Sequence, residues 1–378
     1  MNTGPRKMGP LKIGPLQVDP PVVLAPMAGV TNAAFRRLCR SYGAGLYVSE
    51  MITARALVEG NPRTGAMLPG ADEPVRSVQL YGVDPAVMAA AVRRLVDDVG
   101  VEHIDLNFGC PAAKVTRKGG GAALPLHHVL FRHVVRAAVT NAGAVPVTIK
   151  MRIGLDDAHR SDVRSASIAV DEGVAAVALH ARTAYQHYAG TANWDAIAEL
   201  KAAVSEVPIL GNGDIWEAAD ATAMMAHTGC DGVVIGRGCL GRPWLFAELA
   251  AHFAGTTPPA TPRLGQVVDV MRTHARLLVE EMGPDRGMRQ MRKHTGWYLT
   301  GYAVGGAGRR TMAQVSTLGE FDALLDELDP DLQLPEHARR TPRGHTNGPV
   351  PVALPRGWLD NLDDPTPPQG ADALVSGG

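Results

Sequence analysis

The feature that most constrains the fold of this 378-residue chain is a series of eight short, β-rich apolar runs. Stretches with the pattern of amphipathic helices separate the runs. Apolar strands that alternate with helices are typical of parallel strands buried on both faces. The pattern therefore predicts an α/β fold, a (β/α)8 TIM barrel, and leaves a doubly wound open sheet as the alternative. The eight runs cover residues 22–27, 45–51, 76–81, 103–110, 146–152, 176–182, 208–214 and 232–237.

Changes in composition along the chain predict three parts. We assign residues 12–255 to the barrel, which ends at the start of the linker-like segment AGTTPPATPRLG. Helical periodicity resumes beyond this segment and predicts a small all-helical domain at 262–330. Residues 331–378 are rich in Pro, Gly, Asp and His and have little apolar periodicity, so we predict a mostly disordered tail.

Charge and cysteine content limit the class of protein. The net charge is -1, so a nucleic-acid partner would have to meet a local basic patch. The four cysteines form neither a CxxC motif nor a metal-ligand spacing, which predicts reduced thiols and no metal site. The N-terminus does not resemble a signal peptide, and no apolar run is long enough to span a membrane. We expect a soluble cytoplasmic protein whose oligomeric state the sequence leaves open, a monomer being compatible with it.

Two glycine-rich strand ends predict a phosphate site. In a (β/α)8 barrel, functional groups lie where the strands end, and the loops after strands seven and eight commonly bind phosphate. The segments GNGDI (211–215) and IGRG (235–238) stand at those places. Glycine allows backbone N–H groups to approach phosphate closely, and Arg237 can add a bidentate contact. The alternative is that these glycines only form tight turns.

Other polar residues at strand ends fit a heterocyclic ligand. Lys150 could place a cation beside developing negative charge, or it could simply extend to solvent from the barrel rim. Gln79 could pair with a heterocycle edge or with the backbone. His180 and Arg182 could bind phosphate or substrate, although a rim histidine paired with a carboxylate is a comparable explanation. Together with the phosphate site, these residues suggest a phosphorylated heterocyclic cofactor across the barrel mouth.

Cys110 is the candidate reactive group. It follows a strand, in LNFGCPAAKVTRKGGG, and precedes Lys114, Arg117 and Lys118. As a thiolate it would be a nucleophile, and as a thiol it could be a general acid; these residues alone do not decide between the two roles, and a buried structural cysteine is the alternative. The glycines at 119–121 would allow the loop to hinge over a ligand.

A basic helix face could track RNA. Residues 286–310 contain six Lys and Arg and no acidic residue, and Arg286, Arg289 and Lys293 recur at helical spacing. An ordinary solvated face is the alternative. For the neighbouring Trp297 and Tyr298, core packing is favoured over stacking on a base.

Taken together, the motifs resemble the tRNA-dihydrouridine synthases, and most closely the bacterial B-type enzymes. The ordered set is specific, although each motif alone is weak, and it covers residues 12 to 320. The motifs are APMAGVTNAAFR, VQLYG, DLNFGCPAAKVTRKGGGAAL, TIKMRIG, HART…QHYAG, NGDI and IGRGCLGRPW.

The resemblance implies a flavoenzyme that uses flavin mononucleotide (FMN). NADPH, or NADH, would reduce the flavin, and the flavin would pass hydride to C6 of a D-loop uridine in tRNA while Cys110 protonates C5. Matching positions imply that Asn107 and Arg152 contact the flipped uracil, with His180 near the flavin. The matching cofactor positions are Pro26, Met27 and Ala28 along the ring, Gln79 and Lys150 at its polar edge, and Asn212, Gly213, Asp214, Gly236 and Arg237 at the ribityl phosphate.

The acid role conflicts with the charges beside the thiol. Lys114, Arg117 and Lys118 would stabilise a thiolate. We expect these side chains to face RNA phosphates and to leave the Cys110 pKa near its ordinary value. Base-modifying enzymes require the target base to leave its stack. The flipped uracil would then meet the Cys110 thiol on one face of its ring.

Two other functions share part of the pattern. A small-molecule flavin barrel such as a dihydroorotate dehydrogenase shares the phosphate site and the pyrimidine chemistry, but it would not need a basic helical domain. A protein that only binds RNA would not need Cys110. The sequence does not indicate which D-loop uridine is chosen.

Overall fold

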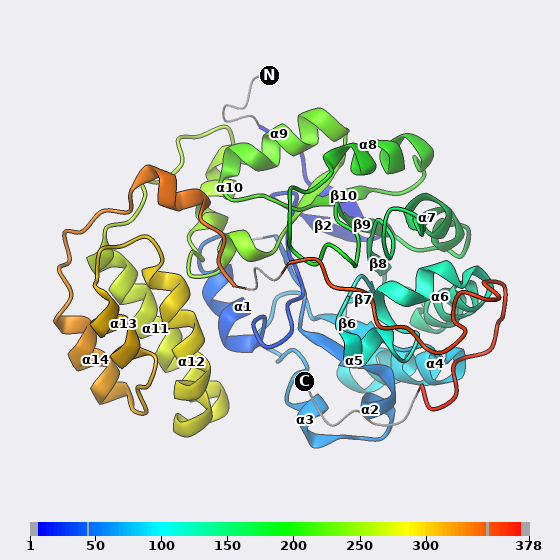
Figure 1. Ribbon diagram of the computed structural model, residues 1–378, viewed down its shortest axis with the longest axis horizontal. Coiled ribbons are helices and arrows are strands. Elements are labelled where there is room, and N and C mark those ends of the chain that lie inside the picture. The colour runs from blue at the N-terminus through cyan, green and yellow to red at the C-terminus, as the bar shows by residue number, and fades with distance from the viewer. Residues whose placement is uncertain (1–6, 44, 345–347, 372–378) are drawn as a thin grey trace.

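The computed structural model describes residues 7–43, 45–344 and 348–371. Its centre is a ring of parallel strands surrounded by helices, and a group of helices packs against one side of the ring (Figure 1). No helix in the described part of the chain is both long and apolar enough to cross a membrane.

The parallel sheet closes into a barrel. The strand order is β4-β3-β11-β10-β9-β8-β7-β6-β5, so the first strand of the barrel lies beside the last. Its two end strands, β4 and β5, are separated in the chain by residues 48–50 only, and the Ser49 amide donates to the Ser77 carbonyl oxygen at 3.1 Å across the break. The predicted (β/α)8 barrel is confirmed and the open sheet is excluded. The strands are β3 (Val22–Leu24), β4 (Leu46–Tyr47), β5 (Met51–Thr53), β6 (Ser77–Tyr81), β7 (His103–Phe108), β8 (Val147–Arg152), β9 (Ala176–His180), β10 (Ile209–Asn212) and β11 (Gly232–Ile235).

Helices cover the outside of the barrel, and local signals set their ends. Asp84 caps the helix that begins at Pro85 by accepting hydrogen bonds from the amides of Ala86 and Val87, and Pro85 occupies the first turn of that helix. The helices and helical turns are α1 (Ala33–Arg40), α2 (Ala54–Val58), α3 (Pro62–Gly65), α4 (Pro85–Arg94) with its π-helical extension η1 (Leu95–Val99), α5 (Ala113–Thr116), η2 (Gly121–Leu126), α6 (His128–Ala142), α7 (Asp162–Asp171), α8 (Trp194–Ala203), α9 (Ala218–Thr228), η3 (Arg237–Cys239) and α10 (Leu245–Phe253).

A short hairpin closes the N-terminal end of the barrel, and we did not predict it. Strands β1 (Leu11–Ile13) and β2 (Leu16–Val18) pair antiparallel through a turn in which Gly14 has a φ of 55°. Leu11, Ile13 and Val18 are buried in one apolar cluster with residues that point into the barrel. Each strand has only three residues, which is too short a run for alternation to be read from sequence.

The helical domain packs on α1 and on the barrel rim. It consists of α11 (Leu264–Met282), α12 (Pro284–Leu299), α13 (Gly306–Met312) and α14 (Leu318–Asp326). Gly283, with a φ of 79°, ends α11, and Pro284 begins α12, which is the usual asymmetry of helix ends. Ala34 and Leu38 of α1 belong to the apolar core of this domain.

The last part of the chain differs from the predicted disordered tail. Residues 331–344 and 348–371, here called the strap, run from the helical domain across the barrel face to α5 and α6 (Figure 1, orange to red). Apart from the helical turn η4 (Glu336–Arg340), the strap has no regular structure among its described residues. Isolated anchors hold it: the Arg242 guanidinium donates to the Arg339 carbonyl oxygen at 2.7 Å, and Trp358 is buried. Residues that hold a segment one at a time produce no helical or strand periodicity in the sequence. The composition of residues 331–378 alone therefore predicts disorder.

Candidate functional site

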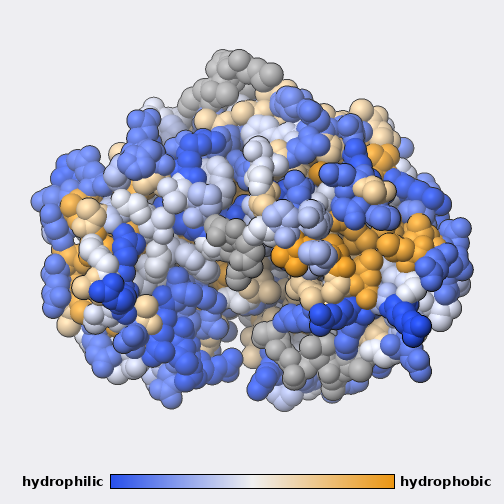
Figure 2. All heavy atoms as spheres, in the orientation of Figure 1, coloured by the Kyte–Doolittle hydropathy of each residue, from blue (hydrophilic) through white to orange (hydrophobic). Residues whose placement is uncertain are grey.

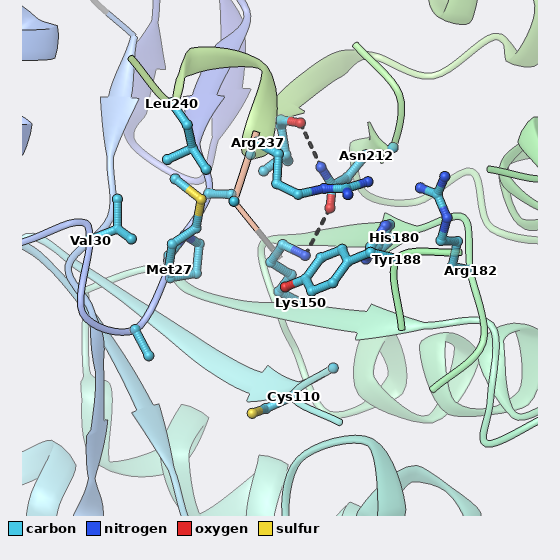
Figure 3. A pocket seen from close by; sticks show the side chains of 18 of the residues that line it. Met27, Val30, Cys110, Lys150, His180, Arg182, Tyr188, Asn212, Arg237 and Leu240 are labelled. Carbon is cyan, nitrogen blue, oxygen red and sulfur yellow. Dashed lines mark hydrogen bonds between the residues drawn. The ribbon is translucent and has the colours of Figure 1, made fainter. Parts of the chain in front are cut away.

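A cavity of about 590 Å³ opens at the carboxyl ends of the barrel strands. Strand register builds it, because Arg152, His180 and Asn212 pair side by side across β8, β9 and β10. Figure 3 shows Cys110 on one side of this cavity and the pair Lys150 and Asn212 on another. The predicted residues that line it are Pro26, Met27, Ala28, Gln79, Asn107, Cys110, Lys150, Arg152, His180, Asn212, Gly213, Asp214, Gly236 and Arg237.

Cys110 follows β7 and is held through its backbone. Its amide donates to Asn107 Oδ1 at 2.9 Å, so the strand end fixes the start of the loop. Burial raises the pKa of the Cys110 thiol, and the nearby cations Arg152 and Lys114 only partly oppose this rise. The thiol is therefore protonated at neutral pH. Cys110 is half-buried, whereas the other three cysteines are fully buried.

A chain of buried polar groups links Asn107 to the barrel interior. Asn107 Nδ2 donates to Gln79 Oε1 at 2.8 Å, and Gln79 Nε2 donates to Asp105 Oδ2 at 2.7 Å. Thr148 donates to the other oxygen of Asp105 at 2.6 Å. Burial raises the pKa of Asp105 to about 6, against the opposing effect of these donors. The amide of Gln79 is thus oriented by two partners, which fixes the groups that it presents to the cavity.

Lys150 places a cation deep in the cavity. Its Nζ donates to Asn212 Oδ1 at 3.0 Å, and Asn212 Nδ2 donates to the Val234 carbonyl oxygen at 2.7 Å (Figure 3). Burial, together with the nearby Arg152, lowers the Lys150 pKa to about 8. An ammonium group with this pKa is charged at neutral pH but is close to losing its proton.

Arg152 and Arg182 hold the loop that follows β9. Arg152 donates to the carbonyl oxygens of Gly109 at 2.9 Å and Thr183 at 2.8 Å. Arg182 donates to the carbonyl oxygens of Ala189 at 3.1 Å and Gly190 at 2.7 Å in that loop, and to both carboxylate oxygens of Asp214 at 2.8 Å. These bonds use much of each guanidinium for positioning. The resemblance assigned a uracil contact to Arg152, and that assignment stays a prediction.

The predicted phosphate end is built around Arg237. Its guanidinium lies 4.5 Å from the Tyr188 ring centroid and 5.4 Å from that of Trp216. Gly213 has a φ of 133°, and a Cβ there would lie 2.7 Å from the Cβ of Ala192, so the backbone passes where a side chain would not fit. The Asp214 carboxylate also accepts from the Ala192 amide at 2.7 Å. Because its oxygens are engaged with these donors, we expect Asp214 to meet a phosphate through its backbone.

Positive charge dominates the cavity. Among the described residues, its lining contains five cationic side chains and a single carboxylate, Asp214, which is an excess of four positive charges. Burial and the surrounding cations hold the pKa of His180 well below its usual value, so His180 is neutral. Such a cavity favours an anionic ligand. The five cations are Lys150, Arg152, Arg182, Arg237 and Lys293.

The basic residues predicted to meet RNA divide into two groups. Lys293 of α12 lines the cavity, where its Nζ hydrogen-bonds the Gly29 carbonyl oxygen. Lys114, Arg117, Lys118, Arg286 and Arg289 do not belong to the lining; of these, Lys118 is partly buried and the other four are exposed. Hydrophilic side chains cover most of the helical domain in Figure 2.

Tyr188, Trp216 and Gly344 also line the cavity, and we did not predict them. Tyr188 lies in the stretch QHYAG, which belongs to the quoted motifs, so that stretch already contained the signal. Trp216 follows the GNGDI segment by one position and could have been included with it. Gly344 belongs to the strap, and no local pattern links it to the barrel.

Comparisons with known proteins agree on one family. The model described as "Dihydrouridine synthase (Dus)" matches residues 23–333. A "Probable tRNA-dihydrouridine synthase" of Mycobacterium tuberculosis (strain ATCC 25618 / H37Rv) is 55% identical and covers 95% of this chain and 94% of its own. The "tRNA-dihydrouridine synthase B" of Vibrio cholerae serotype O1 is 41% identical and covers 82% of this chain and 94% of its own.

Proposed function

The chain belongs to the dihydrouridine synthase family, and from this premise we propose that it reduces the C5–C6 double bond of D-loop uridines in tRNA, using NADPH and a bound FMN. The observation that carries the proposal is the cavity at the barrel mouth, with a protonated thiol on one side and a cluster of cations on the other. The family resemblance drawn from the motifs is confirmed.

The residues of the cavity fit a flavin mononucleotide. The excess of four positive charges suits its phosphate and its electron-rich ring. Lys150 and Gln79 would hold the polar edge of the ring, and Pro26, Met27 and Ala28 would contact its face. Asn212, Gly213, Gly236 and Arg237 would hold the phosphate. A flavin held there and reduced by NADPH would supply the hydride for uracil C6.

Cys110 would supply the proton that completes the reduction. A hydride at C6 and a proton at C5 together saturate the double bond, and the thiolate that remains takes a proton from water. The raised pKa of Cys110 supports this role, because the acid must hold its proton before the reaction. The raised pKa differs from the ordinary value that we expected, because burial outweighs the opposing effect of Arg152 and Lys114.

Exposed basic residues on both sides of the mouth would bind tRNA phosphates. Lys114 and Arg117 follow Cys110, and Arg286 and Arg289 lie on α12. RNA phosphates meet such side chains without base specificity. The uridine would leave its stack and enter the cavity, where Asn107 and Arg152 would contact its edges. As a tRNA-modifying enzyme, the protein would act in the cytoplasm.

An anaerobic single-turnover measurement tests the proposal. The purified chain is loaded with flavin and reduced with NADPH, and flavin reoxidation is followed by absorbance after addition of tRNA that lacks dihydrouridine. We expect rapid reoxidation, with NADH compared in parallel. Already modified tRNA is the control and should reoxidise little.

Other results would point elsewhere. If tRNA fails to reoxidise the flavin while a free pyrimidine or a quinone does so, the chain is a small-molecule oxidoreductase. A Cys110 pKa well below neutrality would contradict the acid role. The change Cys230→Ala, which alters a buried cysteine outside the cavity lining, is the matched control for Cys110→Ala.

A further inference from the structure

Trp358 anchors the strap on the barrel. Its indole is 6% exposed and stacks on the His127 ring with centroids 3.6 Å apart. The indole Nε1 donates to the Ala123 carbonyl oxygen at 3.1 Å. The backbone carbonyl oxygen of Trp358 is hydrogen-bonded to His127 Nε2 at 2.6 Å. Ring stacking, a buried N–H bond and a backbone bond fix one orientation of this side chain.

The indole reaches the loop that carries the catalytic thiol. A Cβ at Gly119 would lie 2.6 Å from Trp358 Cη2, so a glycine is needed for the ring to close on the loop. Two residues further, a Cβ at Gly121 would lie 2.5 Å from the Cys110 carbonyl oxygen. The Ala122 amide donates to the same oxygen at 3.1 Å. The segment 119–123 therefore touches Trp358 on one side and Cys110 on the other.

This packing changes the interpretation of the glycine run. We predicted that residues 119–121 form a hinge, but all three are buried. Their missing side chains admit an indole and a cysteine backbone at close range. The conformation of the loop thus depends on a residue about 240 positions away in the chain, and closure of such a contact restricts local opening.

From residue 334 on, the strap lies outside the part of the chain that the family model matches. That model ends at residue 333, and the Vibrio cholerae relative covers 82% of this chain although 94% of its own length is matched. The Mycobacterium tuberculosis relative covers 95% of this chain. The contact from Trp358 to the loop is therefore not a part of the shared barrel and helical domain.

We propose that Trp358 is a positioning residue for Cys110: by packing on Gly119 and bonding to Ala123, it holds segment 119–123 against the Cys110 backbone and keeps the thiol directed into the cavity. The effect of Trp358 on catalysis rests on the proposed function, in which Cys110 is the acid. The contact itself can be measured without turnover.

Site-resolved alkylation of the full chain tests the contact. Iodoacetamide is applied to the wild type, Trp358→Ala, Trp358→Phe and the control Leu359→Ala, and each cysteine is followed by peptide mass spectrometry. Leu359 is the neighbouring strap residue and is 40% exposed. We expect Cys110 alkylation to rise about tenfold in Trp358→Ala and about threefold in Trp358→Phe, because loop opening exposes the thiol. Leu359→Ala should match the wild type.

The three buried cysteines, Cys39, Cys230 and Cys239, separate positioning from unfolding. A rise confined to Cys110 supports the proposal, and unchanged Cys110 alkylation in both Trp358 variants overturns it. If Trp358→Ala exposes all four cysteines, that chain has unfolded globally and Trp358→Phe decides alone. A Trp358→Phe rate equal to that of Leu359→Ala then overturns the proposal.

Single-turnover tRNA reduction distinguishes this proposal from the proposed function. At saturating tRNA, we expect Trp358→Ala to slow reduction about tenfold or more, since misplacement of a catalytic group lowers the rate of the chemical step. A wild type that does not reduce tRNA, with Cys110 alkylation still dependent on Trp358, contradicts the proposed function and leaves the contact standing. A wild type that reduces tRNA, with variants unchanged in both measurements, overturns the positioning role alone.

Discussion

The two ends of the barrel differ in chemistry although the same strands build both. At the N-terminal end, the β1–β2 hairpin packs Leu11, Ile13 and Val18 into an apolar interior. At the carboxyl end, five cations and one carboxylate of the described part of the chain surround an open cavity. Asp105 and Thr148 form a polar layer between them. The comparison indicates that burial of apolar surface at one end stabilises the strands that hold like charges together at the other.

The largest expected effect comes from a change in the reactive group at the open, carboxyl end of the barrel. Cys110→Ala removes the proposed proton donor, and general acid catalysis contributes roughly 10²- to 10⁴-fold to a rate. We expect single-turnover reduction of tRNA to fall by about that factor while the melting temperature changes little. Cys230→Ala is the control and should retain activity. Retained tRNA reduction in Cys110→Ala would assign the acid to another group.

The second change weakens the packing at the N-terminal end of the barrel, which the β1–β2 hairpin closes. Ile13 is 1% exposed, so Ile13→Ala leaves a cavity where the β1–β2 hairpin packs into the barrel. The change should lower the free energy of unfolding by about 2–5 kcal/mol. Urea unfolding measures this loss. The neighbouring exposed residue provides the control Lys12→Ala, for which we expect less than about 0.5 kcal/mol. Activity per folded molecule should be unchanged; a large loss of activity would show that the two ends are coupled.

A pH titration sharpens the comparison at the open end. The Lys150 pKa of about 8 lies below its ordinary value of 10.5, so the ammonium is charged below pH 8 and becomes neutral above it. Affinity for flavin mononucleotide should therefore weaken as the pH rises from 7 to 9, by about tenfold for one charged hydrogen bond. Fluorescence titration of the flavin measures this affinity.

Lys150→Met is the reference for that titration. Its flavin affinity should be weaker at pH 7 and should vary less between pH 7 and 9, because the titrating ammonium is gone. An equal dependence on pH in the variant and the wild type would mean that a group other than Lys150 controls the affinity.

The smallest expected effect concerns the exposed rim. Arg289→Ala should weaken tRNA binding about three- to tenfold and reduce the salt dependence of binding by about one charge, because a phosphate contact releases counterions. A filter or anisotropy assay at several salt concentrations measures both. Arg136→Ala on α6, whose side chain is 56% exposed and bonds Glu172, is the control. An unchanged salt slope for Arg289→Ala would remove α12 from the RNA surface.

Much of the open end could be predicted because strand ends meet in register. Residues such as Asn107 and Lys150 are adjacent partners across β7 and β8, so their positions in the chain already placed them together. The contacts of Arg152 and Asp214 could not be predicted in the same way. Their partners are backbone groups of loops, and the geometry of a loop leaves no periodic trace in sequence.

The closed end and the strap were missed for a related physical reason. The β1 and β2 strands have three residues each, and Trp358 is a single anchor in a polar, proline-rich segment. Propensity and periodicity need longer runs than these to be informative. The bonds that hold such elements are long-range, and only the folded chain brings their partners together.

The strap has a consequence for the order in which the molecule is made. During synthesis, the N-terminal part of a chain emerges and folds first. The barrel ring closes when β11 (Gly232–Ile235) pairs with β3, but Trp358 is added more than a hundred residues later. A nascent chain would thus hold a closed barrel before its thiol loop is set. On this view, translation itself delays catalytic competence until the helical domain, which would receive the RNA, has also left the ribosome.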